Sequence, residues 1–499
     1  MHVALNKFFT RYPNKSRRLL EVIPPLIGIF LVSLPFWGAL LFPVYLAYFI
    51  IFFNVYWLYK SANLAITSWI ASRKIHEAEK KDWLMEAEKI AAFDKVTHLI
   101  IIPSYKETLE KLKLTLESIK NQTFPKKRLF VYLAMEEREQ NVKEKAEKLK
   151  KEYEKVFGGF YYTLHPDLPN EVKGKSSNQA YAARKAYTEL IKRQKLDIDF
   201  MTVSSVDADV LFDKQFYSYL AYAFLISADP HYAFWQSANV NYNNFWKVPS
   251  FTRIISFFGS LWRTSILVQH IRLIPNSVYS LSFKLLHSLD YWDSDVIPED
   301  YRIFFKAYFR TKGRVIVEPI FLKTSMDAAQ SSSYVGSLMN KYHQERRWSW
   351  GISDDALYIR WYLTIAGVPF FKKTLLVANV VMDHILWPVN WFFITVSANA
   401  VVLLNPVFSR TNLGYTLPQL SGFILTLCLV SLVGMIYVDY TMRSRSSFSK
   451  QSKIRQLLFP LEFIFMPIGG FLLSALPALI TQIQLIIGKR MEYKVTDKV

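Results

Sequence analysis

The sequence predicts an α/β domain inserted between two groups of membrane-spanning α-helices, and three observations lead to this prediction. The stretch 22–59 contains no charged side chain, in a chain of which 51% is hydrophobic. The stretches 374–439 and 456–488 are almost free of charge, and roughly 20 apolar residues are enough for a helix to cross a bilayer. Between these regions, short β-rich runs alternate with segments of helical periodicity, which is typical of α/β folds.

The N-terminal part divides into a membrane hairpin and a linker. Residues 1–60 begin with a basic segment and continue into two spans, predicted at 22–40 and 41–57. This apolar stretch is too long for a cleaved signal peptide. Residues 61–96 are apolar at first and then highly charged. They form either an interfacial helix on the membrane surface or an ordinary amphipathic linker.

The rest of the chain forms the α/β domain and a second membrane region. We assign residues 97–373 to the domain and residues 374–499 to the membrane region. Two spans are predicted in the latter, at 385–404 and 417–438, because these stretches are long and apolar.

Clusters of Lys and Arg predict the orientation of the spans, because cytoplasmic loops carry an excess of positive charge. One cluster precedes the first span, at Lys7, Arg11, Lys15, Arg17 and Arg18, and another follows the fourth, at Arg443, Arg445, Lys450, Lys453 and Arg455. We therefore expect a multi-pass protein of the plasma membrane with its α/β domain in the cytoplasm. Residues 456–488 leave two alternatives: one crossing, with Lys489 and Arg490 outside, or two crossings by short helices that break at Gly469-Gly470.

The formal net charge of +20 limits the classes of binding partner that we expect for this chain. Nucleic acid is not expected, because the sequence shows no compact basic domain. Anionic lipid headgroups and a polyanionic substrate, such as a nucleotide-sugar, both fit the excess of cations. The single cysteine, Cys428, excludes a disulfide framework and suits a reducing compartment.

Strands and helices are predicted to alternate within the domain. The strands are expected at 99–103, 129–135 and 201–207, with helices at 108–122, 141–157 and 176–193. This order predicts a parallel sheet, in which ligands gather at the carboxyl ends of the strands. Such ends coincide with Pro103-Ser104-Tyr105, Met135-Glu136-Glu137 and Asp207-Ala208-Asp209, so we expect one shared site.

Three candidates for that site follow from side-chain chemistry. Asp207 and Asp209, one residue apart at a strand end, are expected to point the same way and to hold a hard divalent cation, or to form an acidic turn without a ligand. Gly174-Lys175 at a helix start suits phosphate, or is a plain helix cap. Asp300 is a candidate general base for a hydroxyl group, or part of an acidic cap.

Four motifs occur in order along the chain: Pro103-Ser104-Tyr105-Lys106-Glu107, Asp207-Ala208-Asp209, Glu299-Asp300 and Gln344-Glu345-Arg346-Arg347-Trp348. Together they resemble the motifs of membrane-integrated family 2 glycosyltransferases, such as cellulose, hyaluronan and chitin synthases. The last motif, Q-x-x-R-W, is the most specific, although Glu345 stands where these synthases commonly have Gln or Arg. The resemblance implies a cytoplasmic GT-A domain between transmembrane segments and an inverting hexosyltransferase.

The resemblance also implies roles for individual residues. Those implied at the nucleotide-sugar are Pro103, Tyr105, Glu107, Glu136, Glu137, Lys175, Asp207, Gln344 and Arg347. Asp207 and Asp209 are implied at Mg2+ or Mn2+, with Asp209 as the direct ligand, and Asp300 as the base. Trp348 is implied at the acceptor sugar, on whose ring an indole stacks. Glu136 and Glu137 are alternatives for one acid after the second strand.

The expected reaction transfers a sugar from a UDP- or GDP-sugar to a growing β-linked polysaccharide, coupled to export through the spans. The alternative is a non-processive enzyme that adds one sugar to a lipid acceptor. Besides the donor, the expected partners are a saccharide or lipid acceptor and membrane lipids, and accessory subunits are left open. A transporter with a regulatory nucleotide-binding domain is the rival from another class. It predicts ionisable residues within the spans, and the first two contain none.

Overall fold

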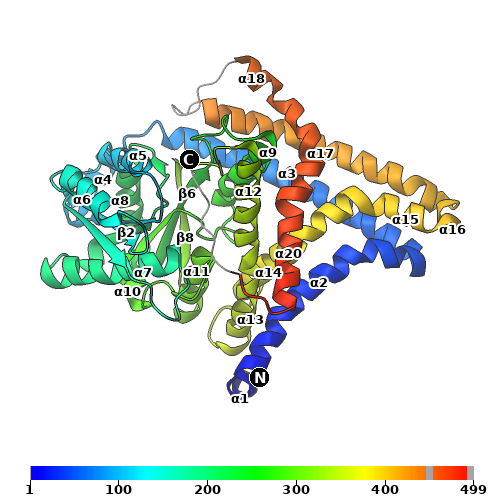
Figure 1. Cartoon of the computed structure of the whole chain (residues 1–499), viewed down its shortest axis with the longest axis horizontal. Helices are drawn as coiled ribbons and strands as arrows, with labels where there is room; N and C mark the ends of the chain where they lie inside the picture. The colour runs from blue at the N-terminus through cyan, green and yellow to red at the C-terminus, as the bar shows by residue number, and fades with distance from the viewer. Residues whose placement is uncertain (1, 445–452, 492–499) are drawn as a thin grey trace.

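The computed structural model describes residues 2–444 and 453–491 of the chain. Figure 1 shows an α/β domain, mostly in cyan and green, beside a group of long helices that extend away from it. Two residues of the predicted basic loop, Arg445 and Lys450, lie outside the described residues.

One eight-stranded sheet forms the centre of the domain, in the order β3-β2-β1-β4-β7-β6-β8-β5. Its strands are β1 (Thr97–Ser104), β2 (Leu129–Glu136), β3 (Gly159–His165), β4 (Met201–Ser205), β5 (Leu211–Phe212), β6 (Ala233–Val240), β7 (Tyr279–Ser282) and β8 (Ile316–Ser325). The pairs β1–β2, β2–β3, β1–β4 and β6–β8 are parallel. β7 runs antiparallel to β4 and β6, and β5 runs antiparallel to β8.

The predicted α/β domain is therefore found, but its sheet is mixed rather than parallel throughout. The chain leaves β6 at its carboxyl end, forms α9 (Ser250–Ser265), and enters β7 from that same end. Because β7 begins at the end of the sheet where β6 finishes, β7 runs antiparallel to β6. The connection between them therefore does not have to cross back along the sheet.

Helices cover both faces of the sheet, and the side chains of β1 divide between two cores. Ile100 and Ile102 belong to one core, and Leu99 and Ile101 to the other. Successive strand side chains alternate between faces, and all four are buried, which explains the continuous apolar run. The covering helices are α5 (Leu109–Lys120), α6 (Val142–Tyr153) and α8 (Phe216–Ile226) on the first face and α7 (Lys175–Ala186), α10 (Phe283–Ser288) and α11 (Glu299–Arg310) on the second.

Five helices in the described part of the chain are long and apolar enough to cross a membrane, consistent with a membrane protein. They are α2 (Pro13–Leu41), α3 (Pro43–Ala78), the run Phe370–Leu404 with α14 (Phe370–Phe392) and α15 (Ala398–Leu404), α17 (Asn412–Ser444), and the run Ile454–Ile486. The predicted spans 22–40, 385–404 and 417–438 lie within the first, third and fourth of these, and the second, 41–57, coincides with α3 except for its first two residues. α3 passes Lys60 without a break, so the linker predicted from residue 61 begins as an extension of the second membrane helix.

The last run does not form two short helices. It contains α18 (Lys453–Leu458), α19 (Met466–Gly470) and α20 (Leu476–Ile486), joined by 3₁₀ and π turns. Gly469 and Gly470 lie inside this continuous helix. The alternative of two crossings that break at these glycines is therefore wrong.

Short elements complete the chain and connect the domain with the membrane helices. They are α1 (His2–Arg11), α4 (Trp83–Glu88), α12 (Tyr334–Ser349), α13 (Asp355–Thr364) and α16 (Pro406–Ser409). α9 contacts both β6 and α3. The Tyr242 hydroxyl donates a hydrogen bond of 3.0 Å to Asp439 Oδ1 of α17, and Lys323 Nζ lies 2.8 Å from Glu79 Oε1 beyond α3. Ionic contacts thus fix the domain against the helices.

Candidate active site

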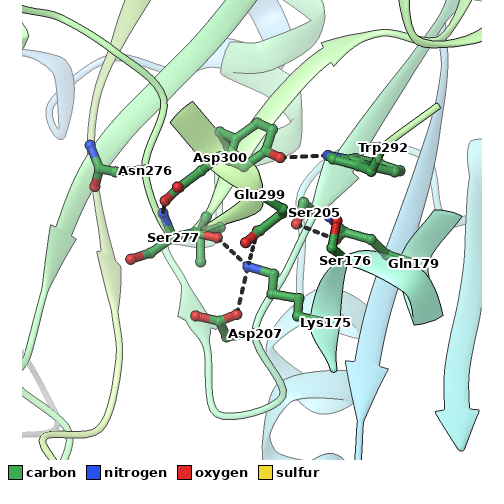
Figure 2. Close-up of polar contacts among 12 residues, drawn as sticks. Lys175, Ser176, Gln179, Ser205, Asp207, Asn276, Ser277, Trp292, Glu299 and Asp300 are labelled. Atoms are coloured by element: carbon green, nitrogen blue, oxygen red, sulfur yellow. Dashed lines mark hydrogen bonds and ion pairs between the residues drawn. The ribbon is translucent and has the colours of Figure 1, made fainter. Parts of the chain in front are cut away.

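Lys175 lies at the centre of a cluster of acidic side chains beside the carboxyl end of β4. Its Nζ lies 2.8 Å from Asp207 Oδ1 and 3.0 Å from Glu299 Oε1, and it donates a hydrogen bond of 2.7 Å to the carbonyl oxygen of Ser277. Figure 2 shows these groups converging on the ammonium. Although burial lowers the pKa of Lys175, Asp207 and Glu299 hold it well above its ordinary value. The ammonium therefore stays charged.

The backbone before Lys175 explains this placement. Gly174 has φ 151° and ψ −162°, a conformation that is almost exclusive to glycine. α7 starts at the next residue, and the Ser176 hydroxyl donates a hydrogen bond of 2.6 Å to the carbonyl oxygen of Asp293. The predicted Gly-Lys motif thus opens a helix directly beside the acids.

Glu299 and Asp300 begin α11 and occupy different environments. Asp300 Oδ2 accepts a hydrogen bond of 3.0 Å from the Ser277 N–H, and Oδ1 accepts one of 2.9 Å from the Tyr301 N–H. Burial raises the pKa of Asp300, although the Ser277 N–H and Lys175 act to lower it. Burial raises the pKa of Glu299 to about 7, and Lys175 opposes this shift. Glu299 is buried and Asp300 is half-buried, so Asp300 is the more accessible of the two.

Asp207 and Asp209 face different partners, contrary to the prediction from strand alternation. β4 ends at Ser205, so both acids lie in a turn, where the alternation of a strand no longer applies. Asp207 is half-buried and pairs with Lys175. Asp209 is buried, and its Oδ2 accepts a hydrogen bond of 3.0 Å from the Asp327 N–H.

The two acids nevertheless fit the predicted Mg2+ or Mn2+. Within residues 2–444 and 453–491, no group of three or more His, Cys, Asp or Glu side chains is placed to hold a metal ion. Mg2+ sites commonly use only one or two carboxylates and complete the shell with phosphate oxygens and water. Asp207 and Asp209, in one turn, supply hard oxygen donors of this kind, and Lys175 neutralises Asp207 in this structure.

The loop after β1 is held together by Glu107. Its Oε2 accepts hydrogen bonds of 2.6 Å from the Tyr105 N–H and 3.0 Å from the Ser104 hydroxyl. The Arg138 guanidinium lies 4.0 Å from the centre of the Tyr105 ring. Glu107 therefore supports the loop that begins at Pro103, and Tyr105 faces the end of the neighbouring strand.

Glu136 and Glu137, which the sequence leaves as alternatives, lie in different environments. Glu136 ends β2, is buried, and pairs with Arg138. It lines a pocket together with Arg138, His165 and Ser177. The side chain of Glu137 is exposed. Glu136, and not Glu137, is therefore among the residues that line this pocket.

The Q-x-x-R-W motif occupies the last turns of α12. Lys341 Nζ donates a hydrogen bond of 3.0 Å to Gln344 Oε1, lies 2.7 Å from Glu345 Oε1, and lies 4.5 Å from the centre of the Trp348 ring. Glu345, the position that departs from the synthases, is therefore buried in an ion pair. Arg347 is half-buried and Trp348 is exposed.

Electrostatic interactions connect this helix with the acid cluster. Burial lowers the pKa of Arg263 to about 10, and the carboxylates of Glu345 and Asp207 both act to raise it. α9, which carries Arg263, contacts the motif helix α12 directly. The structure thus brings Lys175 into contact with Asp207 and Glu299. Ser277, which binds Lys175 through its carbonyl oxygen and Asp300 through its N–H, connects the second acid of α11 with them.

A second set of ionic contacts was not predicted from the sequence. Arg302 donates hydrogen bonds of 2.9 and 2.6 Å to Asp354, and His384 Nδ1 lies 2.8 Å from Asp355 Oδ1. The contact between Glu299 and Lys175 was not predicted either. No local motif indicated these contacts, because the two residues of each pair are far apart in the chain. The one indication of them in the sequence is the pair of adjacent acids, Asp354 and Asp355, after the Q-x-x-R-W motif.

Comparisons with known proteins give only distant similarities. No protein-family model and no curated protein matches the chain. Among solved structures, the mannosyltransferase PcManGT from Pyrobaculum calidifontis in complex with GDP-Man and Mn2+ is 16% identical, with a TM-score of 0.43 over 82% of this chain and 99% of that one. S. aureus TarS 1–349 in complex with UDP is 13% identical, with a TM-score of 0.37 over 70% and 93% of the two chains. These values do not define a family, so function is argued from the site.

Proposed function

We propose that this chain is a membrane-embedded inverting glycosyltransferase with a GT-A domain, which uses a UDP- or GDP-sugar. The observation that carries the proposal is the cluster of Asp207, Glu299 and Asp300 around Lys175 and Ser277. It lies where ligands bind in α/β proteins, at the carboxyl ends of strands. An ammonium beside a helix start suits a diphosphate, and an accessible carboxyl group with a raised pKa suits a general base.

In the proposed reaction, an acceptor hydroxyl attacks the anomeric carbon while the bond to the diphosphate breaks, and Asp300 takes the hydroxyl proton. The N–H groups of Ser277 and Tyr301 fix the Asp300 carboxylate, which still has lone pairs for a proton. A single displacement inverts the configuration, so an α-linked donor yields a β-linkage.

Positive side chains stabilise the leaving diphosphate. Lys175 is positioned to exchange Asp207 for phosphate oxygens, and Arg347 offers a guanidinium that pairs two such oxygens. Mg2+ or Mn2+ held by Asp207 and Asp209 would supply a Lewis-acid charge at the same oxygens. We place the base of the nucleotide beside Glu136 and Tyr105, at the carboxyl ends of β2 and β1, because a buried carboxylate accepts hydrogen bonds from ring N–H groups.

The acceptor is placed at Trp348, next to the membrane helices. The hydroxyl of Ser349, the following residue, donates a hydrogen bond of 3.0 Å to Thr481 in the last apolar run. An acceptor that binds here lies at the edge of the membrane region. This position suits a polysaccharide that leaves through the spans, and it is also the observation that favours the second candidate function, transfer of one sugar to a lipid.

The test is transfer from a panel of radiolabelled UDP- and GDP-sugars by the purified protein in liposomes, with Mg2+ or Mn2+ present or chelated. We expect one donor to give a metal-dependent product. A ladder of lengths identifies a polysaccharide synthase, and one product soluble in organic solvent identifies a glycolipid enzyme. If no donor reacts and calorimetry detects no binding of any of them, the proposal is wrong.

A further inference from the structure

The last apolar run, residues 454–486, contacts the α/β domain near its beginning. Glu462 forms an ion pair with Arg253 of α9. One residue further, the centre of the Phe463 ring lies 5.0 Å from that of Phe257, also in α9. Because α9 packs on β6, this part of the run lies directly against the domain.

The same run contacts the domain again near its end. Arg346 of α12 donates a hydrogen bond of 2.7 Å to Gln484 Oε1, and Ser349 donates one of 3.0 Å to Thr481. From Glu462 to Gln484 a helix rises about 33 Å, at 1.5 Å per residue. A helix that leaves the domain to cross a bilayer about 30 Å thick cannot touch it again at that distance.

The run also lies obliquely across the membrane helices. Trp391 Nε1 donates a hydrogen bond of 2.8 Å to the carbonyl oxygen of Pro467, and Gln482 Nε2 donates one of 3.1 Å to that of His384. Between these contacts the run advances about 22 Å but α14 only about 10 Å. Parallel or antiparallel neighbours would advance equally. In Figure 1, α20 lies across the direction of α3 and α17.

The C-terminal end of the run lies beside the beginning of α2. Arg18 donates a hydrogen bond of 2.7 Å to the carbonyl oxygen of Leu485, and Arg490 Nη2 lies 3.0 Å from Glu21 Oε1. Arg18 and Glu21 precede the first predicted span. The guanidinium of Arg360 in α13 lies 5.7 Å from the centre of the Phe9 ring in α1, which directly precedes α2, so the beginning of α2 belongs to the end of the helix group that faces the domain. Both ends of the run are therefore on the same side.

The run carries an apolar face that no described part of the chain covers. Leu457, Leu461, Ile464 and Ile468 are all exposed. Their spacing of four, three and four residues places them on one side of a helix. Phe463 and Thr481 are buried, on the side that meets the domain. An exposed apolar stripe of this kind, on a helix next to membrane spans, suits a lipid surface.

We infer that residues 454–486 do not cross the membrane but lie in the bilayer face next to the α/β domain, with the apolar stripe in contact with lipid. The described chain then crosses four times, and Lys489 and Arg490 return to the side of the domain. This arrangement is neither of the two alternatives that the sequence left open. It also places the Q-x-x-R-W helix, which rests on this run, at the surface of the bilayer. The inference does not depend on the proposed enzymatic activity.

Single-cysteine labelling tests the orientation. In a Cys428→Ser background, Lys489→Cys reports the end of the run, Lys151→Cys the domain, and Arg410→Cys the connection between the third and fourth membrane helices. All three lysine and arginine side chains are exposed, so the substitutions should not disturb folding. Sealed vesicles of each orientation are treated with a membrane-impermeant maleimide. We expect Lys489→Cys to react in the same vesicles as Lys151→Cys, and Arg410→Cys to react in the opposite ones. Reaction of Lys489→Cys together with Arg410→Cys overturns the inference.

A depth measurement provides an independent readout. A spin label at Leu472→Cys lies near the middle of the run, and Leu472 is exposed. An interfacial helix places such a label about 5–10 Å into the boundary of headgroups and acyl chains. A helix that crosses places it near the bilayer centre, about 15 Å from either face. Power saturation with oxygen and a polar relaxant distinguishes these depths, and a label at the centre contradicts the inference.

Discussion

The guanidinium of Arg302 donates two hydrogen bonds to the carboxylate of Asp354, 2.9 and 2.6 Å long. Arg302 follows the acid pair at the start of α11, and Asp354 follows the Q-x-x-R-W helix. The side chains are 12% and 5% exposed. One buried ion pair thus fixes the segment that carries the proposed base relative to the segment that carries the proposed acceptor site.

Asp354→Asn should destabilise the domain, because it leaves Arg302 buried without its main counter-ion. Breaking a buried pair on one side costs about 3–5 kcal/mol, and we expect the lower end, since Arg302 keeps a contact of 3.4 Å with Asp293. Thermal unfolding of the purified protein in detergent measures the loss. Asp295→Asn is the control, because Asp295 lies 4.0 Å from Arg302 and is 61% exposed. Equal effects of the two substitutions would contradict the assignment.

Lys175→Met should weaken the binding of a nucleotide-sugar by about 10–100-fold, the equivalent of a charged hydrogen bond of about 1.5–3 kcal/mol. The substitution removes the ammonium that we place at the diphosphate, and it leaves Asp207 and Glu299 without their shared cation. Calorimetry with the donor identified by transfer gives the affinity. Lys185→Met is the matched control, because Lys185 lies on the same helix and is exposed. Unchanged affinity in Lys175→Met would remove this lysine from the donor site.

Local sequence patterns predicted the strands β1, β2 and β4 and the helices α5, α6 and α7, but not where β4 ends. The run from Leu99 to Ile102 is buried on both faces, and its lack of polar residues is visible without knowledge of its neighbours. The end of a strand depends on pairing: β4 follows β1 only as far as Ser205, opposite Ile101. The chain then turns, and this turn gives Asp207 and Asp209 different partners.

The partners of the charged side chains were harder to predict from the sequence than the helices and strands. Lys175 and Ser277 are separated by 102 positions, and a motif reports a residue type but not the residue it meets in space. The antiparallel strand β7 was also missed, because four residues are too few to show an alternation. The chemistry of the site was therefore visible as a set of candidates, and the folded chain was needed to show which of them touch.

Glu299 should make the stability of the protein depend on pH in one direction. Its pKa rises from 4.5 to about 7, chiefly through burial. The folded state therefore binds more protons than the unfolded state between these values, and the stabilisation by protonated Glu299 is lost as the pH rises through about 7. The unfolding midpoint of the wild type minus that of Glu299→Gln should thus be smaller at pH 7.5 than at pH 5. A constant difference would mean that Glu299 titrates at its ordinary pKa.

Asp300→Asn should abolish sugar transfer while donor binding is retained. The amide keeps the size of the side chain, and its oxygen can still accept a hydrogen bond from the Ser277 N–H, but it cannot take the proton of the acceptor hydroxyl. Loss of a general base typically lowers the rate by about 10²- to 10⁴-fold.

Transfer assays and calorimetry on the same preparation separate catalysis from binding for Asp300→Asn. Glu299→Gln is the comparison, because Glu299 is buried and faces Lys175 rather than Ser277. We expect it to weaken the donor site more than the chemical step. Near-normal turnover by Asp300→Asn, together with a loss of kcat in Glu299→Gln, would assign the base to Glu299, whose raised pKa already allows it to hold a proton near neutral pH.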